Sequence, residues 1–196
     1  MKGLALTTLL AGSAVLAMGV AFSRAAPADD RAASLAAFQQ MASVMTGPRC
    51  MNCHTVTGFP RQGDDRHPHL YGVSRGPDGH GVVGLRCATC HGRANNASSG
   101  VPGADDDWHL APLSMGWEGL SKAGICRELK DPARNGARTG AGVIDHLKTH
   151  LVMWAWAPGT DQHGHARTPP PIDYATFLRA AETWVKTGEA CPRAAA

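Results

Sequence analysis

The chain has 196 residues, which is the length of one domain or of two very small ones. Its formal net charge is +3, which falls to +1 when Lys2 and Arg24 of the first 25 residues are removed. The remainder contains no basic stripe and no block of like charges, so the sequence gives no support for nucleic-acid binding. With 23 glycines and 13 prolines, the chain is expected to be rich in loops.

The first 25 residues have the pattern of a secretory signal. Lys2 supplies a short positive region, an apolar run covers residues 3–22, and Ser23 and Ala25 are small residues at the −3 and −1 positions of a cleavage site. We therefore expect residues 1–25 to be removed and residues 26–196 to form a periplasmic domain that is not inserted in the membrane. The alternative is an uncleaved membrane anchor, because about twenty apolar residues can span a bilayer.

The first predicted element of the mature chain is an amphipathic helix over residues 31–45, which ends at Gly47 and Pro48. Its apolar residues recur at steps of three and four. They are Leu35, Phe38, Met41, Ala42 and Met45. Residues 55–86 and 92–116 contain many glycines, prolines and asparagines, and we expect both segments to consist mostly of turns.

Three more helices are predicted in the last third of the chain, over residues 118–130, 139–157 and 173–187. The second carries Val143, Leu147, His150 and Trp154 on one stripe, and Asp173 is the expected N-cap of the third. No window alternates convincingly between apolar and polar residues as a strand does. The predicted fold class is mainly α, a single domain with about four helices and long loops.

Two copies of a short motif carry the chemistry. The stretch RCMNCH contains Cys50, Cys53 and His54, and RCATCH contains Cys87, Cys90 and His91. Two cysteines separated by two residues and followed at once by a histidine are the attachment signature of c-type haem, in which both thiols bind the porphyrin covalently and the histidine binds its iron. A four-cysteine zinc site or a redox-active cysteine pair would not require the histidines.

The sequence therefore predicts two covalently bound haem c groups, with His54 and His91 as the proximal iron ligands. The haems would give the turn-rich segments an apolar surface on which to pack, so the domain is expected to be haem-packed and the apoprotein poorly folded. The two remaining cysteines, Cys126 and Cys191, are expected to form a disulfide in an oxidising compartment. By loop entropy, such a bond would stabilise the fold by roughly 4 kcal/mol.

The ligand on the far side of each iron is left open by the sequence. Only 32 residues separate His54 from Cys87, and they contain no methionine, so two complete monohaem domains in tandem are not expected. The leading candidates are His69 and His109, which lie in loops after a proximal histidine, and the weaker candidates are Met115 and His150. Met153 is a further downstream methionine, whereas Met41 and Met45 are interpreted as core residues. The ordinary interpretation of His150 is a hydrogen-bonded core histidine.

Other residues near the motifs receive less specific expectations. Arg49 and Arg86 precede the two motifs and are either haem-propionate or partner contacts, or unrelated surface arginines. The five tryptophans are expected to pack on helices or on porphyrin planes, and no chemistry is assigned to them. They are Trp108, Trp117, Trp154, Trp156 and Trp184.

Over residues 35–192 the chain resembles a group of small bacterial dihaem cytochromes c. The resemblance is carried by RCMNCH, GDDRHPH, RGPDGHG, WHLAP, LKDPARNG and a C-terminal CP. Such proteins are often labelled as the cytochrome subunit of isoquinoline 1-oxidoreductase-type molybdenum hydroxylases. The resemblance implies an exported electron-transfer subunit of a periplasmic oxidoreductase, and it favours His69 and His109 as ligands. No molybdenum-cofactor or iron–sulfur cysteine pattern is present in the sequence itself.

The expected function is electron transfer from a partner oxidoreductase, such as a molybdenum hydroxylase, to a respiratory acceptor, without an enzymatic activity of its own. The alternative is a small dihaem enzyme, peroxidase-like or thiosulfate-oxidising, in which one iron keeps an open position. No acid or base is singled out for such a site, although Glu118 and residues 105–107 are available. A haem-based sensor is a third class, for which an appended signalling segment would be expected.

Overall fold

The computed structural model describes residues 28–193, and the predicted signal segment lies outside this range. Between these residues the fold is mainly helical, with six α-helices and two very short hairpins. The α-helices are α1 (Ala28–Met45), α2 (Pro48–Met51), α3 (Lys122–Lys130), α4 (Gly140–Leu147), α5 (His150–Met153) and α6 (Tyr174–Lys186). The strands are β1 (Arg61–Gln62), β2 (His67–Pro68), β3 (Gly81–Val82) and β4 (Leu85–Arg86). Short 3₁₀ turns are η1 (Leu70–Gly72), η2 (Cys87–Thr89), η3 (Leu113–Met115) and η4 (Trp154–Trp156).

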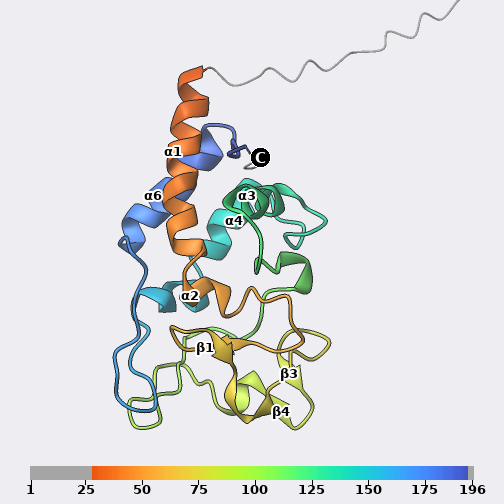
Figure 1. Cartoon of the computed structure of the whole chain (residues 1–196), viewed down its shortest axis with the longest axis vertical. Coiled ribbons are helices and arrows are strands. Elements are labelled where there is room, and N and C mark those ends of the chain that lie inside the picture. Colours follow the sequence, from red (N-terminus) through yellow and green to blue (C-terminus); the bar gives the residue numbers. More distant parts are fainter. Residues whose placement is uncertain (1–27, 194–196) are drawn as a thin grey trace, which may run out of the picture.

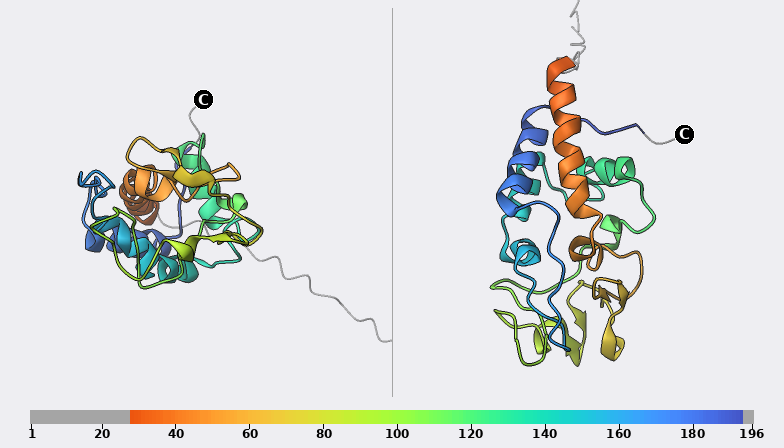
Figure 2. Two further views of the ribbon diagram at one scale, coloured as in Figure 1. Left: turned by 90° about the horizontal axis from the view of Figure 1, so that it is seen from below. Right: turned by 60° about the vertical axis from the view of Figure 1, so that its left-hand side comes forward.

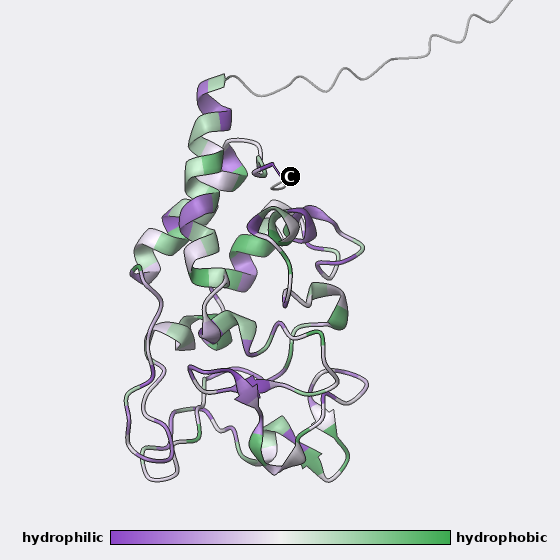
Figure 3. Cartoon of the chain, viewed as in Figure 1, coloured by the Kyte–Doolittle hydropathy of each residue, from purple (hydrophilic) through white to green (hydrophobic). Residues whose placement is uncertain are grey.

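The helices and the loops occupy different halves of the molecule. Figure 1 shows α1, α3, α4 and α6 in the upper half, and the strands and long loops in the lower half. Each hairpin is antiparallel, β1 with β2 and β3 with β4, and each strand is only two residues long. Strand β1 is hydrophilic, whereas apolar and polar residues alternate along the helices (Figure 3). The lower half therefore has little packed core of its own.

The core lies between α1 and α6, which run side by side (Figure 2). Phe38 of α1 packs on Trp184 of α6, with ring centroids 5.8 Å apart, and both side chains are fully buried. Ser34 bonds the two ends of this contact, because its hydroxyl donates to the carbonyl of Trp184 and accepts the N–H of Ala190. The apolar stripe predicted for the first helix thus forms half of the core.

The helix starts follow the capping residues in the sequence. The side chains of Ser121, Thr139 and Asp173 accept backbone N–H groups at the starts of α3, α4 and α6, as expected for N-cap residues. The predicted cap at Asp173 is confirmed. The third predicted helix begins at Lys122 rather than at Glu118, because Ser121 is the cap.

The predicted single helix over residues 139–157 is wrong. The structure ends α4 at Leu147 and begins α5 at His150, with Thr149 extended between them and its hydroxyl bonded to the carbonyl of His146. A threonine whose hydroxyl bonds to a nearby carbonyl competes with the helix, which is a physical reason for the break. The break also removes His150 from the stripe of Val143 and Leu147. His150 is exposed and its Nδ1 bonds to the carbonyl of Asp105, so the interpretation as a core histidine is wrong as well.

Cys126 of α3 and Cys191, which follows α6, form the predicted disulfide, with Cα atoms 5.6 Å apart. The bond closes a loop with a sequence separation of 65 residues. Replacing both cysteines by alanine is expected to lower the free energy of unfolding by roughly 4 kcal/mol, because the unfolded chain regains loop entropy. Urea titration of the haem-loaded protein measures this. A midpoint unchanged from that of the native chain would contradict the role assigned to the bond.

Among residues 28–193, no helix combines the length and the apolar character needed to cross a bilayer.

Candidate functional site

Both predicted motifs fold into the same tight turn. In the first, the N–H groups of Cys53 and His54 donate to the carbonyl of Cys50, at 3.1 Å each. In the second, the N–H groups of Cys90 and His91 donate to the carbonyl of Cys87, at 3.2 and 2.9 Å. The turn therefore repeats in geometry as well as in sequence.

The imidazole rings of the two motifs are held by matching contacts. Nδ1 of His54 lies 2.8 Å from the carbonyl oxygen of Met115, and Nδ1 of His91 lies 2.8 Å from that of Pro102. A carbonyl accepts only from a protonated nitrogen, so in each ring Nδ1 is the donor and Nε2 keeps its lone pair for a metal. A backbone carbonyl on Nδ1 is the usual outer contact of a metal-binding histidine.

A tryptophan completes each arrangement. Trp117 stacks on His54 with ring centroids 3.5 Å apart and planes 12° apart, and Trp108 stacks on His91 at 4.4 Å and 5°. Each indole restricts the rotation of the imidazole about its side-chain bonds. The sequence analysis assigned no role to these tryptophans. The only available signal was that each follows a histidine motif in a turn-rich segment.

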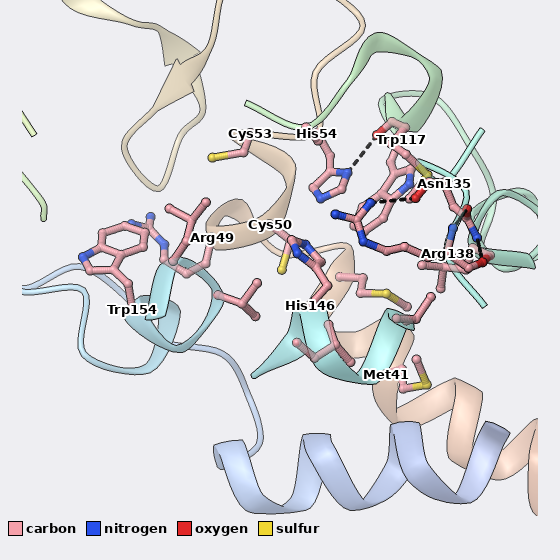
Figure 4. Close-up of a pocket in the computed structure, with 18 of the residues that line it drawn as sticks. Met41, Arg49, Cys50, Cys53, His54, Trp117, Asn135, Arg138, His146 and Trp154 are labelled. Atoms are coloured by element: carbon pink, nitrogen blue, oxygen red, sulfur yellow. Dashed lines mark hydrogen bonds between the residues drawn. The ribbon is translucent and has the colours of Figure 1, made fainter. Parts of the chain in front are cut away.

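The first motif opens on a large apolar cavity between the two halves of the molecule, with about 1110 Å³ of empty space, part of it open to solvent. Its walls come from α1, α4, α5 and α6 and from the segment of Trp108 to Trp117. Cys50, Cys53 and His54 enter from one side, and His146 of α4 enters from the opposite side (Figure 4). Met41 and Met45 are buried in the core, as expected, and they also form part of this wall.

Burial sets the protonation of the groups around this cavity. Burial lowers the pKa of His54 to about 3, raises that of Cys50 to about 12, and raises that of Cys53 to about 11 with a smaller contribution from Cys87. Burial also lowers the pKa of His91 to about 4. At neutral pH both imidazoles are therefore uncharged, as a metal ligand must be. The influence of Cys87 on Cys53 also indicates that the two motifs lie close together.

The cavity fits a haem in its polar groups as well as in its size. Two buried donors, Nε of Arg49 and Nε1 of Trp117, have no hydrogen-bond partner among the described residues, and both side chains line the cavity. A haem carries two propionates, which accept such bonds. Two thiols, an uncharged imidazole, an apolar wall and unpaired donors are the set of groups that a covalent haem requires.

The second motif lies in the loop half of the molecule and is more open. Cys87 and His91 are half-buried and Cys90 is exposed. His69 faces His91, with ring centroids 6.1 Å apart and planes inclined at 64°. Nδ1 of His69 bonds to the carbonyl of Leu70 at 2.8 Å, so its Nε2 is free in the same way as that of His91.

The separation of these two rings is that of two ligands on one metal ion. With nitrogen–metal bonds of about 2.0 Å, and about 1.1 Å from each nitrogen to its ring centre, two imidazoles on opposite sides of one ion have centroids roughly 6.2 Å apart. The measured 6.1 Å agrees with this value. Of the sequence candidates, His69 is the one placed opposite a motif histidine at this distance.

The other candidate ligands have different surroundings. His109 lines the first cavity, but its ring stacks on His80 at 4.9 Å and its Nδ1 bonds to the carbonyl of Asp107. Met115 lines the cavity too, and its carbonyl binds His54 from the motif side. His150 and Met153 are exposed and do not line the cavity.

Three charged side chains named in the sequence analysis are held by ion pairs. Arg49 pairs with Asp64, and Arg86 pairs with Asp78 at 3.0 Å. Glu118 accepts from Arg61 at 3.2 Å and from Arg66 at 2.5 Å. Glu118 therefore joins two loop segments and is not a free acid beside an open site.

Within the described part of the chain, no group of three or more His, Cys, Asp or Glu side chains is arranged to hold a metal ion. A haem iron takes four ligands from its porphyrin and requires at most two from the protein. Comparison with protein-family models, with curated proteins and with solved structures finds no match to this chain.

Proposed function

We propose that the protein is a dihaem c-type cytochrome that carries electrons between redox proteins. The observation that carries the proposal is the repeated geometry of the two motifs. In both, a tight turn places two thiols beside an imidazole whose Nδ1 is held by a backbone carbonyl and whose face stacks on a tryptophan. This is an arrangement for two identical prosthetic groups.

In this proposal Cys50 and Cys53 bind one haem through thioether bonds, and Cys87 and Cys90 bind the other. Haem c, when bound, supplies a ferric/ferrous couple that carries one electron without a change in bonding. His54 and His91 hold the irons from one side, and His69 closes the second site from the other. A histidine on each side leaves no open position for a substrate, which favours a carrier over an enzyme.

The two sites are also suitably close for transfer between them. Trp108 stacks on His91 and lines the cavity of the first site. Cys53 lies close enough to Cys87 for the second thiol to raise the pKa of the first, after the larger effect of burial. An electron entering at the exposed second site would therefore have a short route to the buried first one.

The partners follow from the sequence resemblance. A periplasmic oxidoreductase of the molybdenum hydroxylase type is the proposed donor, and a respiratory protein is the proposed acceptor. The disulfide is compatible with an exported, periplasmic protein.

The test is the mass and the electron paramagnetic resonance (EPR) spectrum of the chain produced in cells that mature c-type cytochromes. We expect two covalently bound haems per chain and two low-spin ferric signals. The variant Cys87→Ala/Cys90→Ala is expected to retain one haem. A chain without covalent haem would refute the proposal, and a stoichiometric high-spin signal in the native protein would favour a dihaem enzyme with an open iron.

A further inference from the structure

We propose that His146 is the second axial ligand of the haem at the first motif, opposite His54. The inference rests on the proposed function and adds a residue that the sequence analysis did not select. With His69 at the second motif, it gives both irons a pair of histidines.

The fold directs His146 into the cavity. It lies on α4 between Val143 and Leu147, and all three line the cavity wall. Residues three and four apart on a helix share one face, so the two apolar neighbours fix the direction of this face. Figure 4 shows His146 reaching toward the cavity from α4, while His54 enters from the opposite side.

The imidazole of His146 has no other partner in the described residues. Its environment consists of burial and of the charges of Arg138, His109 and Asp106, with no hydrogen bond to the ring. A half-buried imidazole in an apolar cavity normally finds a partner, because an unpaired buried polar group is costly. A metal ion in the cavity supplies that partner.

His146 is also the histidine that interacts with His54. The groups whose charges lower the pKa of His54, after the dominant effect of burial, are His146, Arg75 and Arg138. His109 is not among them, and its ring is already stacked on His80 at 4.9 Å. Met115 approaches from the His54 side, since its carbonyl accepts the Nδ1 hydrogen bond of that residue.

The ligand has a consequence for the reduction potential. A thioether ligand raises the potential of a c-type haem relative to a second histidine. Met41, Met45 and Met115 all line the cavity, and the proposal excludes each of them as the iron ligand. The native protein is therefore expected to lack the near-infrared charge-transfer band of methionine bound to ferric iron.

The experiment is the spin state of the haem-loaded variant His146→Ala, measured by EPR together with carbon monoxide binding. We expect one of the two low-spin ferric signals to become high-spin, and the reduced variant to bind one carbon monoxide per chain where the native protein binds none. Added imidazole should restore the low-spin signal. His109→Ala and His150→Ala are the controls, and both should leave the two low-spin signals in place.

Retention of both low-spin signals in His146→Ala would overturn the proposal, and conversion in His109→Ala instead would move the assignment to that residue. If the alanine variant does not accumulate, His146→Met provides the test. It should bring the methionine charge-transfer band and raise the midpoint potential of one haem, and the absence of both changes would refute the assignment. Failure of the proposed function is distinguishable, because the native chain would then lack covalent haem.

Discussion

Replacing Cys50 and Cys53 together by alanine is expected to abolish the stable fold, whereas the same change at Cys87 and Cys90 should leave the helical half folded. The reason is that the wall of the first cavity is also the hydrophobic core. Core residues that line it are Met41, Met45, Met115, Trp117, Leu129, Val143, Leu147 and Phe177. The second motif borders exposed loops instead, and residues 92–99 are all exposed.

The magnitude follows from the cavity. If only a third of its 1110 Å³ stayed as a void, the loss at about 24 cal/mol per Å³ would be roughly 9 kcal/mol. That is comparable with the whole stability of a typical domain, about 5–15 kcal/mol. The cavity would therefore collapse or the domain would unfold.

Far-UV circular dichroism and thermal unfolding of the two double variants measure the difference. The variant lacking the first pair should show no cooperative transition, and the variant lacking the second pair should keep most of its helical signal and melt cooperatively. Equal stability of the two variants would contradict the assignment of the first site to the core.

The sequence predicted the helical core well because its signals were local. The apolar steps of residues 31–45, the cap at Asp173 and the pairing of Cys126 with Cys191 each depend on neighbours in the chain or on the elimination of other partners. The break at Thr149 was missed because apolar spacing continues across it, while a single hydroxyl group accompanies the change of direction.

The site was predictable in its covalent part and not in its surroundings. Two cysteines and a histidine at fixed spacing identify the attachment points without reference to the fold. The opposite ligand is a long-range choice, since His146 is 92 positions after His54 and reaches it only through the packing of α4. The stacking of Trp117 and Trp108 on the motif histidines is likewise a product of tertiary structure.

Replacement of Arg75 by methionine is the second change expected to have a large effect. Arg75 is 7% exposed, and its guanidinium donates to carbonyl oxygens of Thr55, Thr57 and Ala111 and to the hydroxyl of Thr55. It thereby joins the segment after the first motif to the segment before Met115. Burial lowers its pKa, and no carboxylate of the described residues contributes to its charge environment. The sequence offered no sign of this residue beyond its position in RGPDGHG.

Methionine fills a similar volume but donates no hydrogen bond, so several buried carbonyl groups would lose their partner. A hydrogen bond from a charged donor contributes about 1.5–3 kcal/mol, so loss of the set should lower the free energy of unfolding by roughly 3 kcal/mol or more. The charge of Arg75 is also felt at His54, whose pKa it lowers after burial and other contributions. Its removal should therefore stabilise the ferric state and lower the midpoint potential of the first haem.

Arg75→Lys separates the two effects, because lysine keeps the positive charge but lacks the planar fork that reaches several acceptors at once. Chemical denaturation and potentiometric titration of both variants should show a stability loss in each, with a lowered potential in Arg75→Met alone. A methionine variant with native stability would show that the buried guanidinium does not join the loops. Equal potentials in the two variants would show instead that the charge of Arg75 does not reach the first iron.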